Sequence, residues 1–221
     1  MSSPPAPAPR IVLVRHGRPA HARGGWFDAD GVRGWLHAYD AAGLAADDAP
    51  PPALVALAAD AALVLASDLP RARESAARLA PEAPVVESPL LRETPPPVPA
   101  LGPVRLPLAG WALAFGARLA LQAARGVPAP APALRQAREA ALWLAGLAHA
   151  HGLIVAVTHH TVRALIADAL VGGGWSLGPT PGRLAGRHGH WSAWALDPRA
   201  DAGRARAAAA AQPRSTSTPT S

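Results

Sequence analysis

The sequence predicts a three-layer α/β/α fold with a mostly parallel central sheet. Short, fully apolar runs rich in Val, Ile and Leu have the composition of strands that are buried on both faces. These runs alternate with helical segments of ten or more residues, which is the length that a crossover between parallel strands requires. The 221 residues suffice for one large domain of this kind.

The expected elements follow from apolar runs, helical periodicity and proline breaks. Strands are expected at Ile11–Val14, Leu63–Ala66, Pro84–Glu87, Leu153–Thr158 and His190–Leu196. Helices are expected at Val32–Ala42, Ala53–Asp60, Leu69–Leu79, Leu108–Arg125, Leu134–Ala150 and Val162–Val171. The proline-rich stretch Leu91–Pro107 is expected to follow an irregular path.

Composition divides the chain into a folded part and two tails. Residues 1–10, rich in Pro and Ala, predict a disordered leader. Residues 11–197 form the predicted domain, with an apolar helical cap inserted at about 103–130. Residues 198–221 consist mainly of Ala, Arg, Ser, Thr and Pro, so a disordered tail is expected there.

Composition also excludes several classes of function. The chain has no cysteine, which excludes disulfides, thiol catalysis and Cys-based metal sites. The net charge of +6 and the pI of about 11.4 arise from arginine alone, because the sequence has no lysine. The arginines are scattered and form no basic run interleaved with aromatic residues, so nucleic acid is not an expected partner.

No segment predicts a membrane span. The most apolar stretch, Leu106–Ala117, is well short of the ~20 residues that a spanning helix needs. The first ten residues, MSSPPAPAPR, contain several prolines, whereas a signal peptide would have an apolar region there. A cytoplasmic protein without a transmembrane segment is therefore expected.

Titratable residues follow three of the predicted strands. Arg15 and His16 follow the first strand, Arg71 lies shortly after the second, and His159 and His160 follow the fourth. In a parallel sheet the carboxyl ends of the strands meet at one edge, which is where sites form in this architecture. The sequence thus predicts a cluster of histidines and arginines at that edge.

This cluster indicates phosphoryl transfer. A neutral imidazole is a nucleophile near pH 7, and guanidinium groups match the charged oxygens of a phosphoryl group in pairs. Gly17, directly after His16, would let the backbone approach the phosphate. The helices that start after the strands would add free backbone N–H groups.

The same residues resemble the histidine phosphatase superfamily, also called phosphoglycerate mutase-like. The segment LVRHGRP is similar to its RHG signature, SDLPRARESA to its second motif, and VTHHTVRALI to its third. The resemblance covers about Ile11 to Leu196. It implies the phosphoglycerate mutase-like fold, with His16 as the phospho-acceptor and Arg15, Arg71 and His159 around the phosphate, His159 as an imidazolium.

The resemblance also implies a proton donor, but two residues compete for that role. Glu93 lies in a Leu-x-Glu turn like the one that carries the family's acid, although prolines follow it. His160 takes the place of a glycine usual in the family and lies next to the phosphate-binding His159. Pro19 and Ala22 replace a hydroxyl residue and an asparagine that the family often has after its nucleophile.

Other conspicuous side chains have simpler interpretations. Arg73 and Arg78 are expected to be solvated, and His149 and His151 to be structural residues at a helix end. His188 and His190 are spaced for a metal in principle, but no carboxylate accompanies them and no metal site is predicted. Several aromatic residues are expected simply to pack in the core or in a lid over the site: Trp26, Trp35, Tyr39, Trp111 and Phe115.

The predicted function is a phosphomonoester hydrolase that needs neither a metal nor another cofactor and acts through phosphohistidine at His16. Its partner would be a small phosphomonoester. The alternatives are a phosphoglycerate mutase-type transferase and a phosphate-binding pseudoenzyme. The apolar cap suits a substrate with a hydrophobic or flat organic part, or else an interface of a homo-oligomer.

Overall fold

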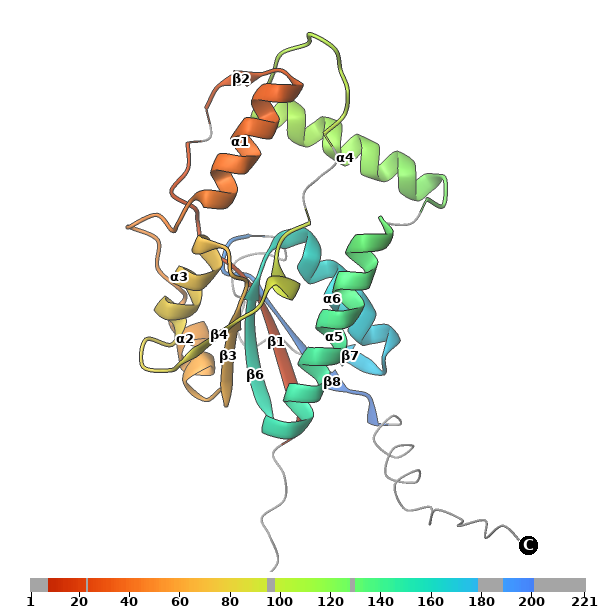
Figure 1. Cartoon of the computed structure of the whole chain (residues 1–221). Coiled ribbons are helices and arrows are strands. Elements are labelled where there is room, and N and C mark those ends of the chain that lie inside the picture. Colours follow the sequence, from red (N-terminus) through yellow and green to blue (C-terminus); the bar gives the residue numbers. More distant parts are fainter. Residues whose placement is uncertain (1–7, 23, 95–97, 128–129, 179–188, 201–221) are drawn as a thin grey trace, which may run out of the picture.

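The computed structural model describes most of the chain (Figure 1). The described residues are 8–22, 24–94, 98–127, 130–178 and 189–200. Most of the predicted leader (residues 1–7) and of the predicted tail (residues 201–221) therefore lies outside the described part, as does His188.

A six-stranded sheet forms the centre of the molecule, in the order β4-β3-β6-β1-β8-β7. The strands are β1 (Arg10–Arg15), β3 (Leu63–Ala66), β4 (Val85–Glu87), β6 (Leu153–Thr158), β7 (Trp175–Leu177) and β8 (Ala193–Pro198). Strands β4, β3, β6 and β1 are mutually parallel, whereas β8 runs antiparallel to β1 and to β7. The predicted mostly parallel α/β fold is confirmed.

Helices cover both faces of this sheet (Figure 1). Helices α2 (Pro52–Ala59) and α3 (Pro70–Leu79) lie on one face, and α5 (Ala131–His151) and α6 (His160–Gly172) on the other. Successive side chains of β1 alternate between the two cores: Ile11 and Leu13 pack towards α5 and α6, Val12 and Val14 towards α2 and α3. This two-residue period explains why the strand is apolar at every position.

The helix ends follow local sequence. Proline lies at the start of α2, α3 and α5, where its missing N–H costs no hydrogen bond. Asp28 caps the N-terminus of α1 (Ala29–Ala41) by accepting a hydrogen bond from the Gly31 amide at 2.8 Å. Gly152 ends α5 at a φ of 88°, a conformation that glycine adopts without a steric penalty.

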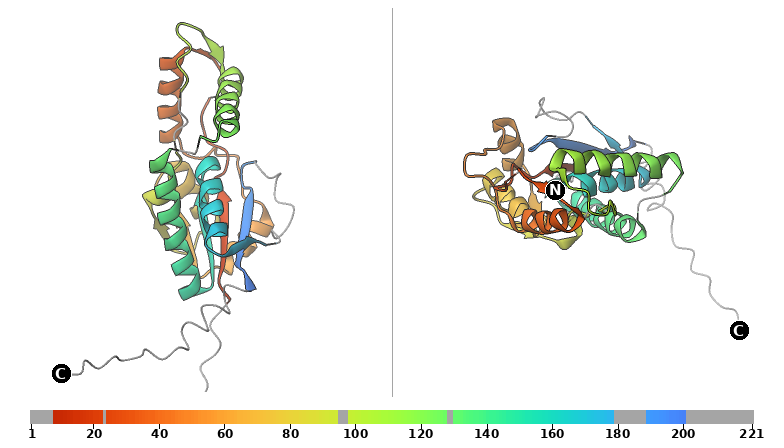
Figure 2. Two further views of the ribbon diagram at one scale, coloured as in Figure 1. Left: turned by 90° about the vertical axis from the view of Figure 1, so that its right-hand side faces the viewer. Right: turned by 90° about the horizontal axis from the view of Figure 1, so that it is seen from above.

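A separate cap lies beyond the carboxyl ends of the parallel strands (Figure 2). It consists of α1, α4 (Leu108–Ala124) and a two-stranded sheet of β2 (Trp26–Phe27) and β5 (Leu106–Pro107). The indole N–H of Trp111 donates to the Phe27 carbonyl at 2.8 Å, and Arg105 donates to the Trp26 carbonyl at 2.9 Å. These bonds join two segments that are about 80 residues apart in the sequence.

Several features differ from the expectations. The cap includes α1 and β2 in addition to the segment at about 103–130, because the β2–β5 pairing draws the earlier segment away from the sheet. The irregular stretch 91–107 ends in β5, and a short 3₁₀ helix (Pro89–Leu91) lies at its start. Strands β2, β5 and β7 were not expected, because two or three residues are too few to show a clear period in the sequence.

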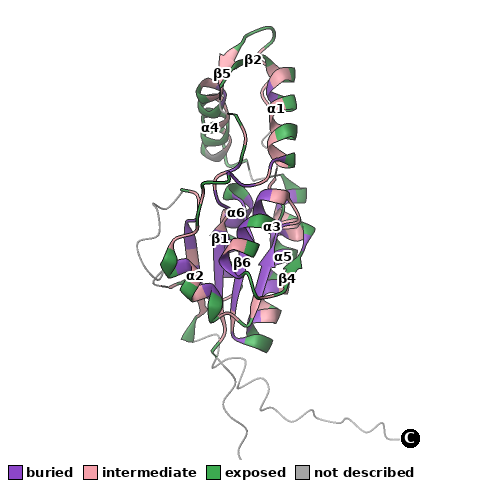
Figure 3. Cartoon of the chain, turned by 90° about the vertical axis from the view of Figure 1, so that its left-hand side faces the viewer, coloured by how far each residue is buried: buried purple, intermediate pink, exposed green. Residues whose placement is uncertain are grey.

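Burial is concentrated in the sheet and in the helix faces that cover it, whereas the cap is mostly intermediate or exposed (Figure 3). In the cap, Trp111 is 1% exposed and forms its centre, but Trp26 is 63% exposed and packs into neither core nor lid. Among the described residues, no helix is both long and apolar enough to cross a membrane.

The contrast between two leucines of α5 tests this packing. Leu144 is fully buried in the core between the helices and the sheet, whereas Leu142 on the same helix is 76% exposed. We expect Leu144→Ala to lower the free energy of unfolding by about 2–5 kcal/mol, because it leaves a cavity in the core. Leu142→Ala should change it by less than about 0.5 kcal/mol in the same urea titration. Equal losses would contradict the described orientation of α5.

Candidate active site

The predicted histidines and arginines meet at one edge of the sheet because three strands end in register. β6 lies between β3 and β1, with Arg15 opposite Thr158 and Ala66 opposite Val157. The ladder continues one residue further, since the His16 amide donates to the Thr158 carbonyl at 3.0 Å and the Ser67 amide to the Val157 carbonyl at 2.9 Å. This pairing places His16, Ser67 and His159 side by side.

His16 is 2% exposed, and its two ring nitrogens have different partners. Nδ1 lies 2.7 Å from the Gly17 carbonyl oxygen, which can only accept, so Nδ1 carries the proton. Nε2 therefore has the lone pair, and Nε of Arg71 donates to it at 3.3 Å. A neutral imidazole with its lone pair on Nε2 has the form that a nucleophilic histidine requires.

Arg71 is fully buried and organises the site. Besides His16, its guanidinium donates to the Tyr39 carbonyl at 2.9 Å and to the Asp40 carboxylate at 2.9 Å. It also lies 4.5 Å from the centre of the Tyr39 ring. Glu74, three residues after Arg71 on the same helix, accepts the Leu44 amide at 2.7 Å.

His159 is buried beside His16, with 5.0 Å between the two ring centres. Its Nε2 lies 2.9 Å from the Ser67 hydroxyl. Its Nδ1 is buried and has no hydrogen-bond partner among the described residues. A buried polar atom of this kind costs free energy unless a ligand pairs with it, so it marks a place for an anion or a donor–acceptor group.

Burial and the neighbouring arginines keep both imidazoles neutral. Burial lowers the pKa of His16 well below 6.5, and His159 and Arg71 lower it further. Burial and then Arg71 and Arg15 lower the pKa of His159 in the same way. His16 is thus in its nucleophilic form at neutral pH, and the predicted imidazolium of His159 would require a bound anion to favour its charge.

Glu93 lies at the start of α6, immediately beyond His159 and His160. Its carboxylate accepts the amides of Thr161 at 3.2 Å, Val162 at 3.1 Å and Thr94 at 3.1 Å. These bonds favour the carboxylate, but burial outweighs them and raises the pKa of Glu93 above its usual 4.5. A raised pKa suits a carboxyl that must donate a proton.

The loop that carries Glu93 is held from two sides. The Thr158 hydroxyl donates to the Leu91 carbonyl at 2.7 Å, and the Gln136 amide donates to the Leu90 and Arg92 carbonyls at 3.1 and 3.0 Å. The end of β6 and helix α5 therefore fix Glu93 despite the prolines after it. Its neighbour across the edge is Arg71, whose charge acts on the carboxylate.

Gly17 has a packing role in addition to the predicted one. A Cβ at this position would lie 2.4 Å from the Asp48 carboxylate and 2.5 Å from the Trp191 ring. The Gly17 amide donates to the Ser75 hydroxyl at 2.9 Å, so this N–H is already engaged within the protein. Glycine is required here because two side chains press on the backbone behind the nucleophile.

Trp191 supports the same turn in a left-handed conformation. Its φ is 60°, it is 4% exposed, and its indole N–H donates to Asp48 at 2.7 Å. Its amide donates to the Arg15 carbonyl at 3.1 Å. A bulky residue in this conformation is strained, and such strain persists where the surroundings hold a functional turn in place.

Arg163 lies behind the site from α6. It is fully buried, donates to the Ser192 carbonyl at 2.6 Å and lies 4.0 Å from the centre of the Trp194 ring. Burial and Arg15 lower its pKa to about 10, while Glu93 acts in the opposite direction. This second buried arginine adds positive potential behind the phosphate position.

A cavity of about 730 Å³ opens between the cap and the sheet edge. Arg15 and His190 lie at its base, and α1 and α4 form its walls. The ring of His190 is 5.6 Å from that of His16, and its Nδ1 is 3.4 Å from the His16 carbonyl. His190 therefore lies at the edge of this site, a position that the sequence did not predict for it.

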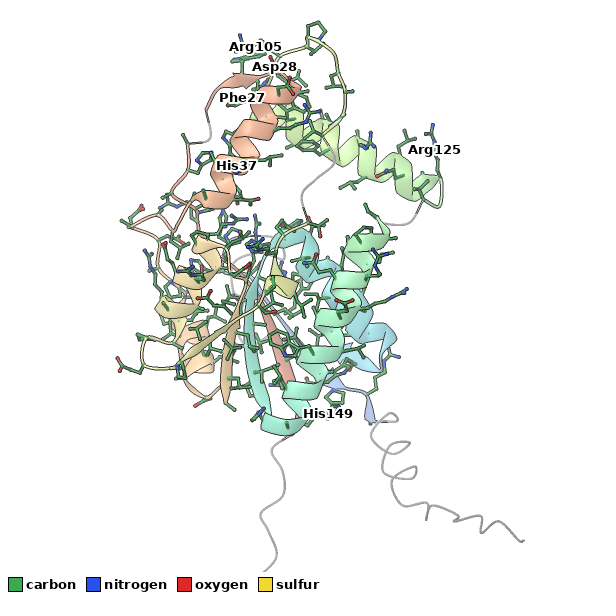
Figure 4. All side chains as sticks on the ribbon, in the orientation of Figure 1. Phe27, Asp28, His37, Arg105, Arg125 and His149 are labelled. Carbon is green, nitrogen blue, oxygen red and sulfur yellow. The ribbon has the colours of Figure 1, made fainter. Side chains whose placement is uncertain are left out.

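The remaining predicted residues lie outside this cluster. His160 is exposed as the first residue of α6, and Arg73 is exposed and pairs with Glu87 at 3.3 Å. Arg78 is not solvated as expected, because it donates to the carbonyls of Ala45 and Asp48. His149 lies at the end of the molecule opposite the cap (Figure 4). Among the described residues, no group of three or more metal-ligating side chains occurs.

The sequence missed supporting residues rather than central ones. Tyr39, Asp40 and Asp48 lie in loops or on a helix far from any motif, and Arg163 was seen only as part of a helical run. Ser75 lies within the second motif, four residues after Arg71, which is the one signal that identifies a polar partner for the Gly17 turn.

Two solved structures of mycobacterial proteins share this architecture. One, described as mycobacterial hydrolase 1, is 23% identical with a TM-score of 0.51, and the match covers 86% of this chain and 89% of that one. The other is a mycobacterial glucosyl-3-phosphoglycerate phosphatase in complex with VO3, also 23% identical with a TM-score of 0.51, over 87% and 98% of the two chains. The chain has the phosphoglycerate mutase-like fold.

This result confirms the fold that the three motifs implied. No protein-family model and no curated protein matches the sequence.

The buried neutral histidines predict how stability depends on pH. The pKa values of His16 and His159 are lower in the folded chain than in the unfolded chain, so the unfolded state binds more protons as the pH falls through about 6.5. We expect the free energy of unfolding to decrease from pH 7.5 to pH 5.5. The slope should reach at most about 1.4 kcal/mol per pH unit for each histidine.

Urea titrations at several pH values measure this slope. The variant His159→Asn should reduce it, because one buried titrating group is lost. The matched control His151→Asn changes an exposed histidine and should leave the slope as in the parent chain. A slope unaffected by His159→Asn would contradict the lowered pKa.

Proposed function

We propose that this protein hydrolyses phosphomonoesters through a phosphohistidine on His16, without a metal ion. The observation that carries the proposal is the buried, neutral imidazole of His16. Its Nδ1–H donates a hydrogen bond to the Gly17 carbonyl, and the lone pair on its Nε2 accepts a hydrogen bond from the guanidinium of Arg71. The chain would thereby belong to the histidine phosphatase superfamily that its motifs resemble.

In the first step, Nε2 of His16 attacks the phosphorus atom, and the bond from phosphorus to the ester oxygen breaks in line. The negative charge on the non-bridging oxygens is stabilised by Arg15, Arg71 and His159. Phosphate oxygens would pair with the orphaned Nδ1 of His159 once that nitrogen is protonated. These three cations supply charge that a metal ion provides in other phosphatases.

Glu93 serves as the acid in this step and as the base in the next. Its carboxyl proton moves to the departing ester oxygen, which leaves as an alcohol. The resulting carboxylate then takes a proton from water, the water oxygen bonds to phosphorus, and the nitrogen–phosphorus bond breaks. Phosphate is released, and both His16 and Glu93 return to their starting forms.

One of the solved structures with the same fold supports the proposed phosphatase function. One of the two structures with the same fold is named as a phosphatase and holds VO3. Vanadium oxyanions can take the five-coordinate geometry that phosphorus passes through, and stable mimics of a transition state bind tightly. Vanadate is therefore expected to inhibit this protein as well.

Removing the nucleophile is the direct test. We expect His16→Ala to abolish release of phosphate from para-nitrophenyl phosphate and to abolish acid-labile labelling of the protein by a ³²P-labelled phosphomonoester. The exposed His151→Ala variant is the control and should retain both. If His16→Ala keeps activity within about tenfold of the parent chain, a loss of only ~1.4 kcal/mol, the covalent mechanism is wrong.

The same assay addresses the metal and the alternative reaction. EDTA should leave the rate unchanged, and loss of activity with recovery by a divalent ion would contradict the metal-independent step. Isomerisation of a phosphoglycerate without release of phosphate would instead identify a mutase. Phosphate binding with neither reaction would identify a pseudoenzyme.

The identity of the acid is tested by the leaving group. An alkyl phosphate expels a poor alkoxide and needs a proton in the transition state, whereas para-nitrophenolate leaves unaided. We expect Glu93→Gln to lower kcat/KM on alkyl phosphates by roughly 10²–10⁴ and much less on the aryl ester. His160→Gly should have a mild effect on both, because His160 is exposed at the start of α6. The reverse result would assign the proton to His160.

A further inference from the structure

The cavity under the cap differs in chemistry from the phosphate site next to it. Its base carries Arg15 and His190, and these are the only charged or titratable side chains apart from the Tyr39 phenol among the described residues that line it. Its walls are apolar, with four aromatic rings facing it from α1 and α4: Trp35, Tyr39, Trp111 and Phe115.

The polar atoms of the wall tryptophans are already paired outside the cavity. The indole N–H of Trp35 donates to the Ala22 carbonyl at 2.9 Å, and that of Trp111 donates to the Phe27 carbonyl at 2.8 Å. What these residues present to the cavity is therefore the apolar surface of their rings. A hydroxyl or carboxylate held against this wall would lose its hydration without gaining a partner.

A stack of rings connects the wall to the phosphate site. The guanidinium of Arg71 lies over the Tyr39 ring at 4.5 Å, and Tyr39 stacks on Trp35 with 5.1 Å between ring centres and 22° between planes. The cavity is thus lined by Arg15 of the proposed phosphate site, and Arg71 lies against Tyr39 of its wall. A substrate with its phosphorus at His16 would extend its alcohol portion along this stack.

We infer that the cavity binds the alcohol portion of the substrate and that this portion is an uncharged, largely apolar group with an aromatic or other flat ring. The cavity of about 730 Å³ lies in the range of sites for small organic molecules. Flat rings gain from contact with the aromatic rings that line the cavity as well as from burial. Polyol and carboxylate phosphates, in contrast, meet a mostly apolar lining whose charged or titratable side chains, among the described residues, are Arg15, His190 and Tyr39. This inference rests on the proposed phosphatase function.

The test compares substrates whose leaving groups have similar intrinsic reactivity. Both 2-naphthylmethyl phosphate and glycerol 3-phosphate expel a primary alkoxide, so differences in kcat/KM report on recognition of the alcohol portion. We expect kcat/KM to be at least tenfold higher for 2-naphthylmethyl phosphate. An equal or lower value would overturn the inference, and so would a preference for 3-phosphoglycerate over either.

Two variants of α4 locate the preference in the cavity. Phe115→Ala removes an aromatic wall, and Ala112→Glu adds a carboxylate to the apolar lining. Each should lower the ratio of the two kcat/KM values at least fivefold. The matched controls Leu119→Ala and Ala117→Glu change residues of α4 that do not line the cavity, and they should keep the ratio of the parent chain. A ratio that is unchanged in both cavity variants would overturn the inference.

Binding separates this inference from the proposed reaction. In isothermal titration calorimetry, His16→Ala should bind 2-naphthylmethyl phosphate with a Kd at least tenfold lower than that for glycerol 3-phosphate. If this preference appears but the parent chain releases no phosphate from any ester, the proposed function fails and the cavity assignment stands. If phosphate is released but the two ligands bind equally, the function stands and the cavity assignment fails.

Discussion

The pairing of β6 with β1 and β3 is the constraint on which the site depends. Only in this order do the ends of the three strands deliver His16, Ser67 and His159 to adjacent positions. Backbone hydrogen bonds just beyond the last paired residues, from the His16 amide to Thr158 and from the Ser67 amide to Val157, fix the distances between these strand ends. Since a slip of one residue would turn every side chain of the buried strands to the opposite core, the two apolar cores enforce the register of the site.

Burial then sets the chemistry of the residues that the sheet has assembled. His16 and His159 lie among arginines in a water-poor environment, which disfavours their charged forms, whereas the same burial favours the protonated form of Glu93. Opposite pKa shifts of this kind suit the proposed roles of His16 as nucleophile and Glu93 as acid at one pH. Arg71 is held between these groups by hydrogen bonds that it donates to the Asp40 carboxylate and to two backbone carbonyls.

In the function that we propose, the cap would select the substrate, and the residues at the ends of the strands would carry out the reaction. One half comes from the connection between β1 and β3 and the other from the connection between β4 and β6, and the two are joined by the β2–β5 pairing and by the Trp111 indole. The cap buries little of its own surface, so its position depends on a few specific contacts rather than on a large core (Figure 3). The aromatic stack from Arg71 to Trp35 links this lightly packed layer to the rigid edge of the sheet.

By itself the sequence determined the α/β class, the main strands and helices, and the central residues of the site, because these depend on local periodicity and on motifs that directly follow strands. Only the tertiary structure decided the strand order, the entry of α1 and β2 into the cap, and the partners Tyr39, Asp40, Asp48 and Arg163. Local sequence carries no signal for these contacts, since they join segments that become neighbours only when the sheet and its two cores form. The ionisation of His16 and Glu93 was decided in the same way, because burial is a property of the packed chain and not of the residue.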